Sequence, residues 1–208
     1  DKYLTGLTQL AANPNTRIIS FTVTEAGYYL DAHDQLDISF ADLRSDLAGT
    51  TRSTIYGALT QLLTARMQAQ AGAITLLNCD NLRSNGERFM GGLQQFLQQS
   101  GHHELLAWLA SHASAPNSMV DRITPRPTPD VRERVKAATG RDDAAAVMGE
   151  SFIQWVIEDH FMAERPAWES VGAEMVNDVM PYEEAKIRLL NATHSCIAWA
   201  GTLRGYTY

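Results

Sequence analysis

The feature that most constrains the fold is an alternation of short apolar strands with helical patterns in the first half of the chain. Residues 17–24 are apolar and rich in β-branched side chains, and turn-forming residues flank them. A helical pattern follows between residues 51 and 72, then an apolar strand at 73–77, then a second helical pattern from Asn85. This order predicts a βαβ unit with a right-handed crossover, and therefore an α/β fold with a parallel sheet. We expect residues 17–24 to be a buried strand.

The second half of the chain predicts more strands, one crossing segment and a long final helix. The strands are expected at residues 118–124, 151–158 and 173–179. Residues 125–129 contain three prolines, which prevent a helix or a central strand there. Pro181 stands where a helix can begin, and no further Pro or Gly occurs before Gly201, so one helix is expected from Tyr182 to about Thr202.

Composition and charge argue against several classes of protein. The chain has 208 residues, of which 45% are hydrophobic and 20% charged, which suffices for a globular core. Its apolar runs are far shorter than the roughly 20 residues that span a bilayer. The net charge of −7 argues against nucleic acid, and neither nucleic acid nor a membrane is an expected partner. Two cysteines far apart argue against a disulfide framework or a zinc site and fit a reducing cytoplasm.

Polar side chains follow both of the first two predicted strands. They are Thr22, Thr24 and Glu25 after the first strand, and Asn78, Asp80 and Asn81 after the second. In an open parallel sheet, ligands bind at the carboxyl ends of the strands, so the two groups predict a site at one edge of the sheet. The alternative is that these residues only form turns and helix caps.

The final predicted helix carries four polar groups of different chemistry on one broad face. At about 100° per residue, Glu183 and His194 project about 60° and about 80° from Lys186, and Asn191 about 140°. The positive end of the helix dipole disfavours the ammonium form of Lys186, which makes its amine a candidate general base. The alternative is a solvent-facing lysine, beside a glutamate that only complements the dipole and polar groups that are satisfied in the core.

Residues 186–194, KIRLLNATH, match the KxRxLNxxH pattern of the polyol-specific long-chain dehydrogenases, the family of mannitol dehydrogenase and fructuronate reductase. Three more segments resemble the family's other signatures in the same order. They are residues 21–29 (FTVTEAGYY), 78–86 (NCDNLRSNG) and 118–125 (SMVDRITP). The resemblance covers essentially the whole chain. Residues 24–30, 54–57 and 194–203 are most similar to the bacterial branch that oxidises D-arabinitol.

This resemblance implies catalytic roles for five residues. Lys186 would be the general base that takes the alcohol proton while hydride leaves the carbon for the nicotinamide. Asn81 and Asn191 would form an oxyanion hole, because their amides donate to the oxygen on which charge develops. His194 would orient the substrate hydroxyls. Glu183 would lie on a proton path from Lys186 to water.

The resemblance also implies how the cofactor binds. Val120 and Asp121 would line the pocket for nicotinamide and substrate, and Thr24 and Glu25 would lie beside the cofactor. NAD is the expected cofactor, with no metal. NADP stays open, since the glycine-rich turn and the acidic residue that selects the ribose would precede Asp1.

The expected domains follow from the same resemblance. Residues 1–176 would be the distal part of a Rossmann-type dinucleotide-binding domain that lacks its first βαβ unit, and residues 177–208 would begin a mainly helical substrate-binding domain. The expected reaction is the NAD-dependent oxidation of D-arabinitol to D-xylulose. Mannitol 2-dehydrogenase and fructuronate or mannonate oxidoreductase activities are alternatives, and an inactive fragment is the non-enzyme alternative. The expected partner is a small polyol or ketose, and the expected state is a monomer or weak oligomer.

Overall fold

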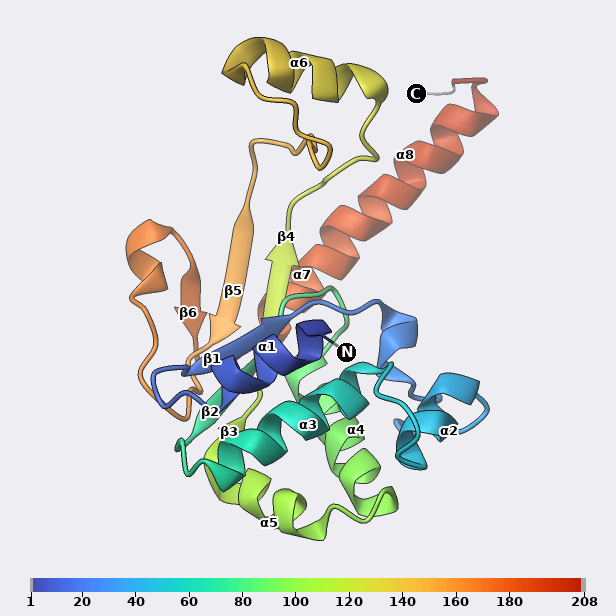
Figure 1. Ribbon diagram of the computed structural model, residues 1–208. Helices are drawn as coiled ribbons and strands as arrows, with labels where there is room; N and C mark the ends of the chain where they lie inside the picture. Colours follow the sequence, from blue (N-terminus) through green and yellow to red (C-terminus); the bar gives the residue numbers. More distant parts are fainter. Residues whose placement is uncertain (1, 207–208) are drawn as a thin grey trace.

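The computed structural model describes residues 2–206. The helices are α1 (Lys2–Ala11), α2 (Ala41–Leu47), α3 (Ile55–Gln68), α4 (Asn85–Gln99), α5 (His103–His112), α6 (Pro129–Thr139), α7 (Met180–Ala185) and α8 (Ala192–Leu203). The strands are β1 (Ile18–Phe21), β2 (Ile74–Asn78), β3 (Ala113–Ser114), β4 (Ser118–Asp121), β5 (Gln154–Glu158) and β6 (Glu174–Val176). Residues 2–206 also form two short 3-10 helices, η1 (Glu25–Tyr28) and η2 (Trp168–Val171), and a π-helix, η3 (Lys186–Asn191) (Figure 1).

The first sheet contains the predicted βαβ unit. Its strand order is β1-β2-β3, and both pairs are parallel, with Ile18 opposite Thr75 in the register of β1 on β2. The crossover helix α3 connects β1 to β2, as the alternation of patterns predicts. β2 is buried along its whole length, but β1 is only partly buried and Ser20 is exposed. The expectation of a fully buried first strand is therefore wrong, because β1 lies at the edge of the sheet.

Helices α3, α4 and α5 build the main core against this sheet (Figure 1). Tyr56 of α3 stacks on Phe89 and Phe96 of α4, with ring centroids 5.4 and 5.8 Å apart. All three rings are buried. α3 begins where Thr54 caps it, because the Thr54 hydroxyl accepts the N–H of Gly57. The helical periodicity of residues 51–72 therefore corresponds to the face of α3 that is buried in the core.

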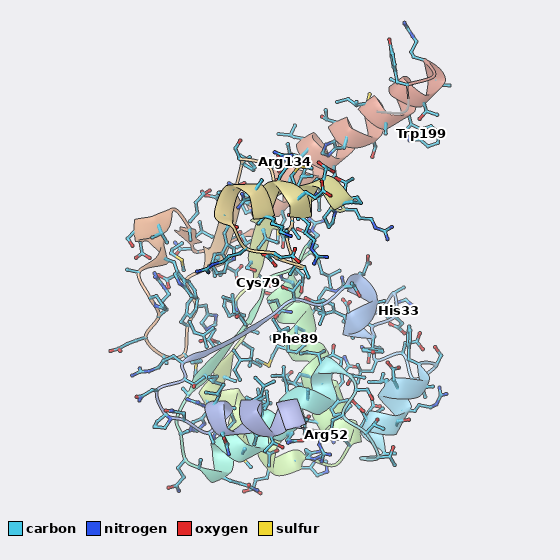
Figure 2. The ribbon with its side chains drawn as sticks, turned by 45° about the horizontal axis from the view of Figure 1, so that its top comes forward. His33, Arg52, Cys79, Phe89, Arg134 and Trp199 are labelled. Carbon is cyan, nitrogen blue, oxygen red and sulfur yellow. The ribbon has the colours of Figure 1, made fainter. Side chains whose placement is uncertain are left out.

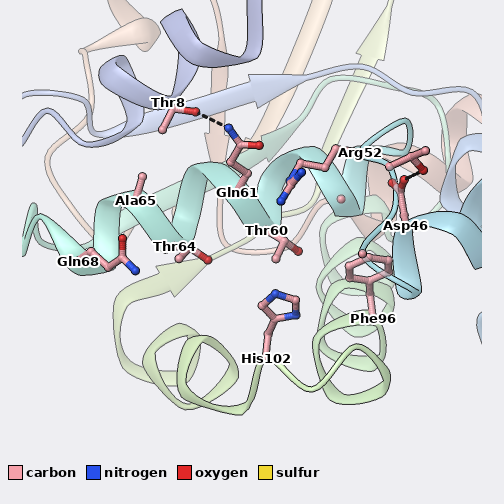
Figure 3. A pocket seen from close by; sticks show the side chains of 13 residues that line it. Thr8, Asp46, Arg52, Thr60, Gln61, Thr64, Ala65, Gln68, Phe96 and His102 are labelled. Atoms are coloured by element: carbon pink, nitrogen blue, oxygen red, sulfur yellow. Dashed lines mark hydrogen bonds between the residues drawn. The ribbon is translucent and has the colours of Figure 1, made fainter. Parts of the chain in front are cut away.

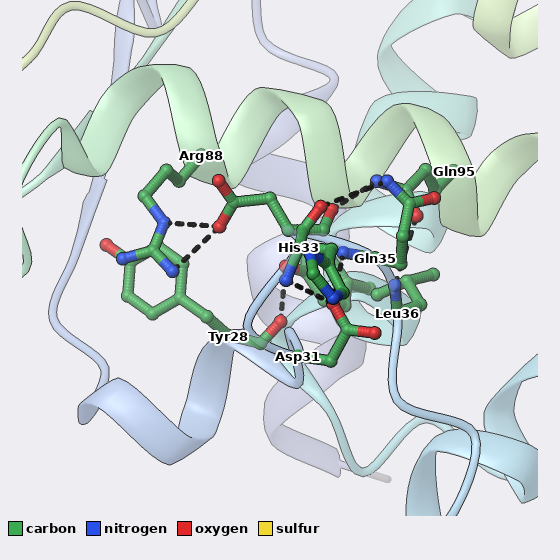
Figure 4. Close-up of polar contacts among 9 residues, drawn as sticks. Tyr28, Asp31, His33, Gln35, Leu36, Arg88 and Gln95 are labelled. Atoms are coloured by element: carbon green, nitrogen blue, oxygen red, sulfur yellow. Dashed lines mark hydrogen bonds and ion pairs between the residues drawn. The ribbon is translucent and has the colours of Figure 1, made fainter.

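A loop after β1 is tied to α4 by three polar contacts (Figure 4). Arg88 pairs with the Asp34 carboxylate at 2.8 Å, and the Gln95 amide donates to the Asp34 carbonyl. The same Gln95 side chain accepts the N–H of Leu36. These contacts fix the segment that follows Thr24 against the helix that follows β2.

The second sheet differs from the expected parallel arrangement. The three later strands are found where they are predicted, but β4 and β5 are antiparallel, and only β5 and β6 are parallel. The connection from β4 to β5 runs out through residues 122–128, which have no regular secondary structure, into α6, and back (Figure 1). The expectation of no helix at residues 125–129 is wrong at Pro129 alone, which is the first residue of α6. Because this connection re-enters the sheet at the end where β4 finishes, β5 runs antiparallel to β4.

Hydrogen bonds connect the carboxyl end of β2 to the first residue of β4. The Asn85 amide donates to the Ser118 carbonyl at 3.0 Å, and its oxygen accepts the Ser118 N–H at 2.9 Å. The Ser118 hydroxyl donates to the carbonyl of Asn78, the last residue of β2. The loop after β2 and the start of β4 therefore meet at one place.

The predicted final helix is confirmed, with one local change. α7, η3 and α8 form one continuous helix that projects from the rest of the molecule, so that Trp199 is 74% exposed (Figures 1 and 2). Its middle turn, Lys186–Asn191, is a π-helix, which the sequence pattern does not indicate. Among the described residues, no helix is long and apolar enough to cross a membrane. The domain boundary after residue 176 stays a prediction.

Candidate active site

Lys186 lies where the helix meets the ends of β2 and β4. Its Nζ donates to Asn81 Oδ1 at 2.7 Å and to the Val120 carbonyl at 2.5 Å. It lies 3.6 Å from Asp121 Oδ1, and the Lys186 side chain is only 15% exposed. The alternative of a solvent-facing lysine is therefore wrong. Four residues predicted for the site meet at one nitrogen atom.

The Lys186 contact fixes the orientation of the Asn81 amide. An ammonium group has only donors, so the amide oxygen of Asn81 must face it. The amide NH₂ has no partner among the described residues, and Asn81 lines the cavity beside Lys186. This NH₂ group is therefore available to donate to a ligand oxygen.

A cavity of about 500 Å³ adjoins Lys186. Most of the predicted site residues line this cavity. Those that do so are Asn81, Val120, Asp121, Lys186, Asn191 and His194. Arg122, Ile123, Glu150, Phe152 and Leu190 complete its wall. Asn191 and His194 are exposed, so they are not polar groups satisfied in a core. The volume is within the range of small-ligand pockets, about 300–1,000 Å³.

The π-helix corrects two expectations about the helix face. A π-helix bonds residue i to i+5, so Asn191 lies one turn after Lys186, and the projection of about 140° for an α-helix is wrong. Lys186 is also the first residue after α7, more than one turn from the start of the helix at Met180, whereas the helix dipole acts within the first turn. The dipole explanation is therefore wrong, and the groups that surround the amine are Asn81, Val120 and Asp121.

Glu183 lies in a second, smaller cavity of about 140 Å³ that Lys186, Asn81 and Asn191 also line. Glu183 is 6% exposed, and its Oε1 accepts the Ser84 N–H at 3.0 Å. Burial raises the pKa of the Glu183 carboxyl above its usual range. The cavity has room for a few water molecules, since each takes about 30 Å³ in the liquid. A titratable carboxyl group and the Lys186 amine thus border one space.

Thr24 and Glu25 do not join this cluster. Both are exposed at the beginning of η1, just after β1, and they line neither cavity. They do lie at the carboxyl edge of the sheet, where the Thr22 hydroxyl donates to the Cys79 carbonyl. Their place beside a cofactor stays a prediction.

Burial raises the pKa of the Cys79 thiol to about 11, so this thiol stays protonated at neutral pH.

Sequence reasoning missed Tyr28, which supports the loop that carries Asn81. The buried Tyr28 hydroxyl donates to Asp80 Oδ2 at 2.7 Å and accepts from the Asn78 amide at 2.7 Å. Burial, and after it the hydrogen bond to Asp80, raises the pKa of the Tyr28 phenol. The other Asp80 oxygen accepts the Leu82 N–H. Tyr28 and Asp80 are 52 positions apart, so no local spacing signals their contact.

A separate cavity of about 370 Å³ lies along the outer side of α3, between α1 and the start of α5 (Figure 3). Arg52 and His102 point toward Thr60 from opposite sides there. None of the predicted site residues lines this cavity. Within residues 2–206, no three His, Cys, Asp or Glu side chains are grouped so that they could hold one metal ion. Independence from a metal stays a prediction.

Comparisons with known proteins agree on one family. A model of the mannitol dehydrogenase Rossmann domain matches residues 2–170. The D-arabinitol 4-dehydrogenase of Ralstonia nicotianae is 65% identical over 99% of this chain and 44% of its own length. The D-arabinitol 4-dehydrogenase of Klebsiella pneumoniae is 57% identical over 95% of this chain and 43% of its own length.

A solved structure matches as well. The ternary complex of Pseudomonas fluorescens mannitol 2-dehydrogenase with NAD and D-mannitol has a TM-score of 0.86 and 40% identity, over 97% of this chain and 41% of that chain. This chain thus spans less than half the length of these relatives. The expected family and the Rossmann-type fold are confirmed. The chain belongs to the mannitol dehydrogenase family, and its residues 2–170 match the model of that family's Rossmann domain.

Proposed function

We propose that the protein to which this chain belongs is an NAD-dependent polyol dehydrogenase that oxidises D-arabinitol to D-xylulose. The observation that carries the proposal is the Lys186 amine, held between Asn81, Val120 and Asp121 beside a ligand-sized cavity. D-Arabinitol is preferred over mannitol because the two D-arabinitol 4-dehydrogenases are 57–65% identical to this chain, against 40% for the mannitol 2-dehydrogenase. The cytoplasmic location and the monomeric or weakly oligomeric state stay predictions.

The residues that would hold NAD lie at or just after the carboxyl ends of β1 and β4. The solved relative holds NAD and D-mannitol together, and the cavity beside Lys186 lies at the ends of β2 and β4, where such folds bind dinucleotides. Val120 and Asp121 would hold the nicotinamide end, and Thr24 and Glu25 would lie beside the rest. When bound, NAD accepts the hydride from the alcohol carbon.

To act as a general base, Lys186 must react as the neutral amine. A neutral amine has two N–H groups and one lone pair, and the Asn81 oxygen and the Val120 carbonyl take up both N–H groups. The lone pair is then left for the substrate hydroxyl, whose proton Lys186 takes as the carbonyl forms. Asp121, 3.6 Å away, stabilises the resulting ammonium.

The amides and the imidazole bind the substrate oxygens. The free NH₂ groups of Asn81 and Asn191 would donate to the oxygen that loses its proton, where negative charge develops. His194 lines the same cavity and would bind a neighbouring hydroxyl. Glu183 would pass the proton from Lys186 to water through the smaller cavity that both side chains line.

The stability of the Glu183→Gln variant, relative to that of the wild type, is expected to be greater at pH 7 than at pH 4. Because burial raises the pKa of Glu183 in the folded chain, the protonated folded form is favoured. The stability that the protonated Glu183 carboxyl gives to the folded wild type is fully present below the pKa of the unfolded chain, about 4.3. It is lost as the pH rises through the pKa of the folded chain. The glutamine side chain does not titrate and keeps an oxygen for the Ser84 N–H. Melting curves between pH 4 and pH 8 should show that the variant gains on the wild type as the pH rises; a constant difference would contradict this.

The proposed reaction is tested on the full-length protein with D-arabinitol, D-mannitol and D-mannonate, each with NAD and with NADP. Reduced nicotinamide is followed by its absorbance, and the ketose product is identified by chromatography. We expect the highest kcat/KM with D-arabinitol and NAD, and D-xylulose as the product. A higher kcat/KM for mannitol or mannonate would replace the substrate assignment, and a complete lack of reduction would contradict the enzyme itself.

A further inference from the structure

Two consecutive glutamates of α7 contact the loop that carries Asn81. Glu183 accepts the N–H of Ser84, and Glu184 forms an ion pair with Arg83. The loop connects the end of β2 to the start of α4, and Lys186 follows two residues after Glu184. The contacts of Glu183, Glu184 and Lys186 therefore join one stretch of helix to one short loop.

The loop needs such support because its own backbone is strained at one point. Ser84 has a φ of 50°, the left-handed region that favours glycine. It is also the N-cap residue of α4, yet its side chain makes no capping hydrogen bond. Since the Ser84 side chain does not cap the helix, we expect the contacts from α7 to help to hold this conformation.

The Arg83–Glu184 pair differs from the other ion pair of Glu184. Arg188 also binds Glu184, at 2.5 Å, but it lies one turn along the same helix. Only Arg83 crosses from the loop to the helix, and it lines the smaller cavity beside Glu183 and Lys186. Two arginines thus share one carboxylate, one bridging the loop to the helix and one not.

We propose that Arg83 and Glu184 are positioning residues that hold the Asn81 amide against the Lys186 amine. The inference rests on the proposed function, because it assigns these residues to the same reaction. Arg83 is 51% exposed, and exposed ion pairs contribute only about 0–1 kcal/mol to stability. A shift of the loop nevertheless displaces Asn81 from the oxygen that it binds, and displacements of about 1 Å can cost up to about 100-fold in rate.

The test is a double-mutant cycle on the full-length protein with the matched control R188A. We expect R83A and E184A each to lower kcat for polyol oxidation about tenfold, with the KM for NAD unchanged. The double variant should be no slower than either single one, because both remove the same contact. R83K, which keeps the charge, should retain most of the activity, and R188A should retain all of it. Melting temperatures should stay within a few degrees throughout.

The outcomes separate this inference from the proposed function. If the wild-type protein does not oxidise any polyol, the proposed function fails. If the wild type is active and R83A matches R188A in kcat, the proposed function stands and the positioning role is wrong. Additive losses in kcat for R83A and E184A would equally overturn it, because independent effects would mean that the two side chains do not act as a pair.

Discussion

The substitution Lys186→Ala is expected to lower polyol oxidation by about 10³-fold or more while the chain stays folded. General bases contribute about 10²–10⁴ to a rate, and the Lys186 amine also holds the Asn81 amide in place. The variant loses both the proton acceptor and the donor that orients Asn81. The measurement is kcat for D-arabinitol with saturating NAD, with circular dichroism and melting curves to check folding.

Lys136 provides the matched control, because it is an exposed lysine on α6 that lines neither cavity beside Lys186. Lys136→Ala should keep the wild-type rate. Small primary amines added to Lys186→Ala should restore part of the rate, increasingly at higher pH, since only the neutral amine accepts a proton. If Lys186→Ala keeps more than about a tenth of the wild-type rate, a general-base role at the level expected for such groups is excluded.

The βαβ unit could be predicted because its signals are local. A helix with one buried face has apolar residues three or four positions apart, as in α3, and a strand buried on both faces is a short continuous apolar run, as in β2. The polar residues after β2 could be placed at a ligand edge by topology alone. Lys186 and Asn81 were paired by the family resemblance, and their contact at 2.7 Å agrees with it.

The features that could not be predicted depend on contacts between distant residues. Arg66 lies on the predicted helix and is 1% exposed, because its guanidinium donates to carbonyls at the end of α1 and before β2. A charged residue in a helical pattern normally indicates the solvent face. A sequence pattern with 3.6 residues per turn likewise does not predict the π-helix, which places Asn191 on the same helix face as Lys186. The antiparallel pairing of β4 and β5 depends on the end of the sheet at which the connection through α6 returns to it.

The substitution Gly86→Ala is expected to destabilise the chain by about 3 kcal/mol or more. A Cβ at Gly86 would lie 2.3 Å from the Ala115 carbonyl oxygen and 2.5 Å from that of Pro116. Both atoms belong to backbone, so the start of α4 must move away from the segment that enters β4. Overpacking alone costs about 1–3 kcal/mol, and the movement also breaks the hydrogen bonds between Asn85 and Ser118. Urea unfolding measures the loss.

Gly91 is the matched control, since it lies on the same helix and a Cβ there meets nothing within 4 Å. Gly91→Ala should stabilise the chain by about 0.5–1 kcal/mol, because alanine is the better helix former. Equal effects of the two substitutions would show that helix propensity, and not the contact with residues 115 and 116, decides the outcome. The displacement in Gly86→Ala also separates Asn81, after β2, from Val120, on β4, and these are the two groups that accept the N–H bonds of Lys186. Any Gly86→Ala protein that folds should therefore lose activity through the geometry of the base as well as through stability.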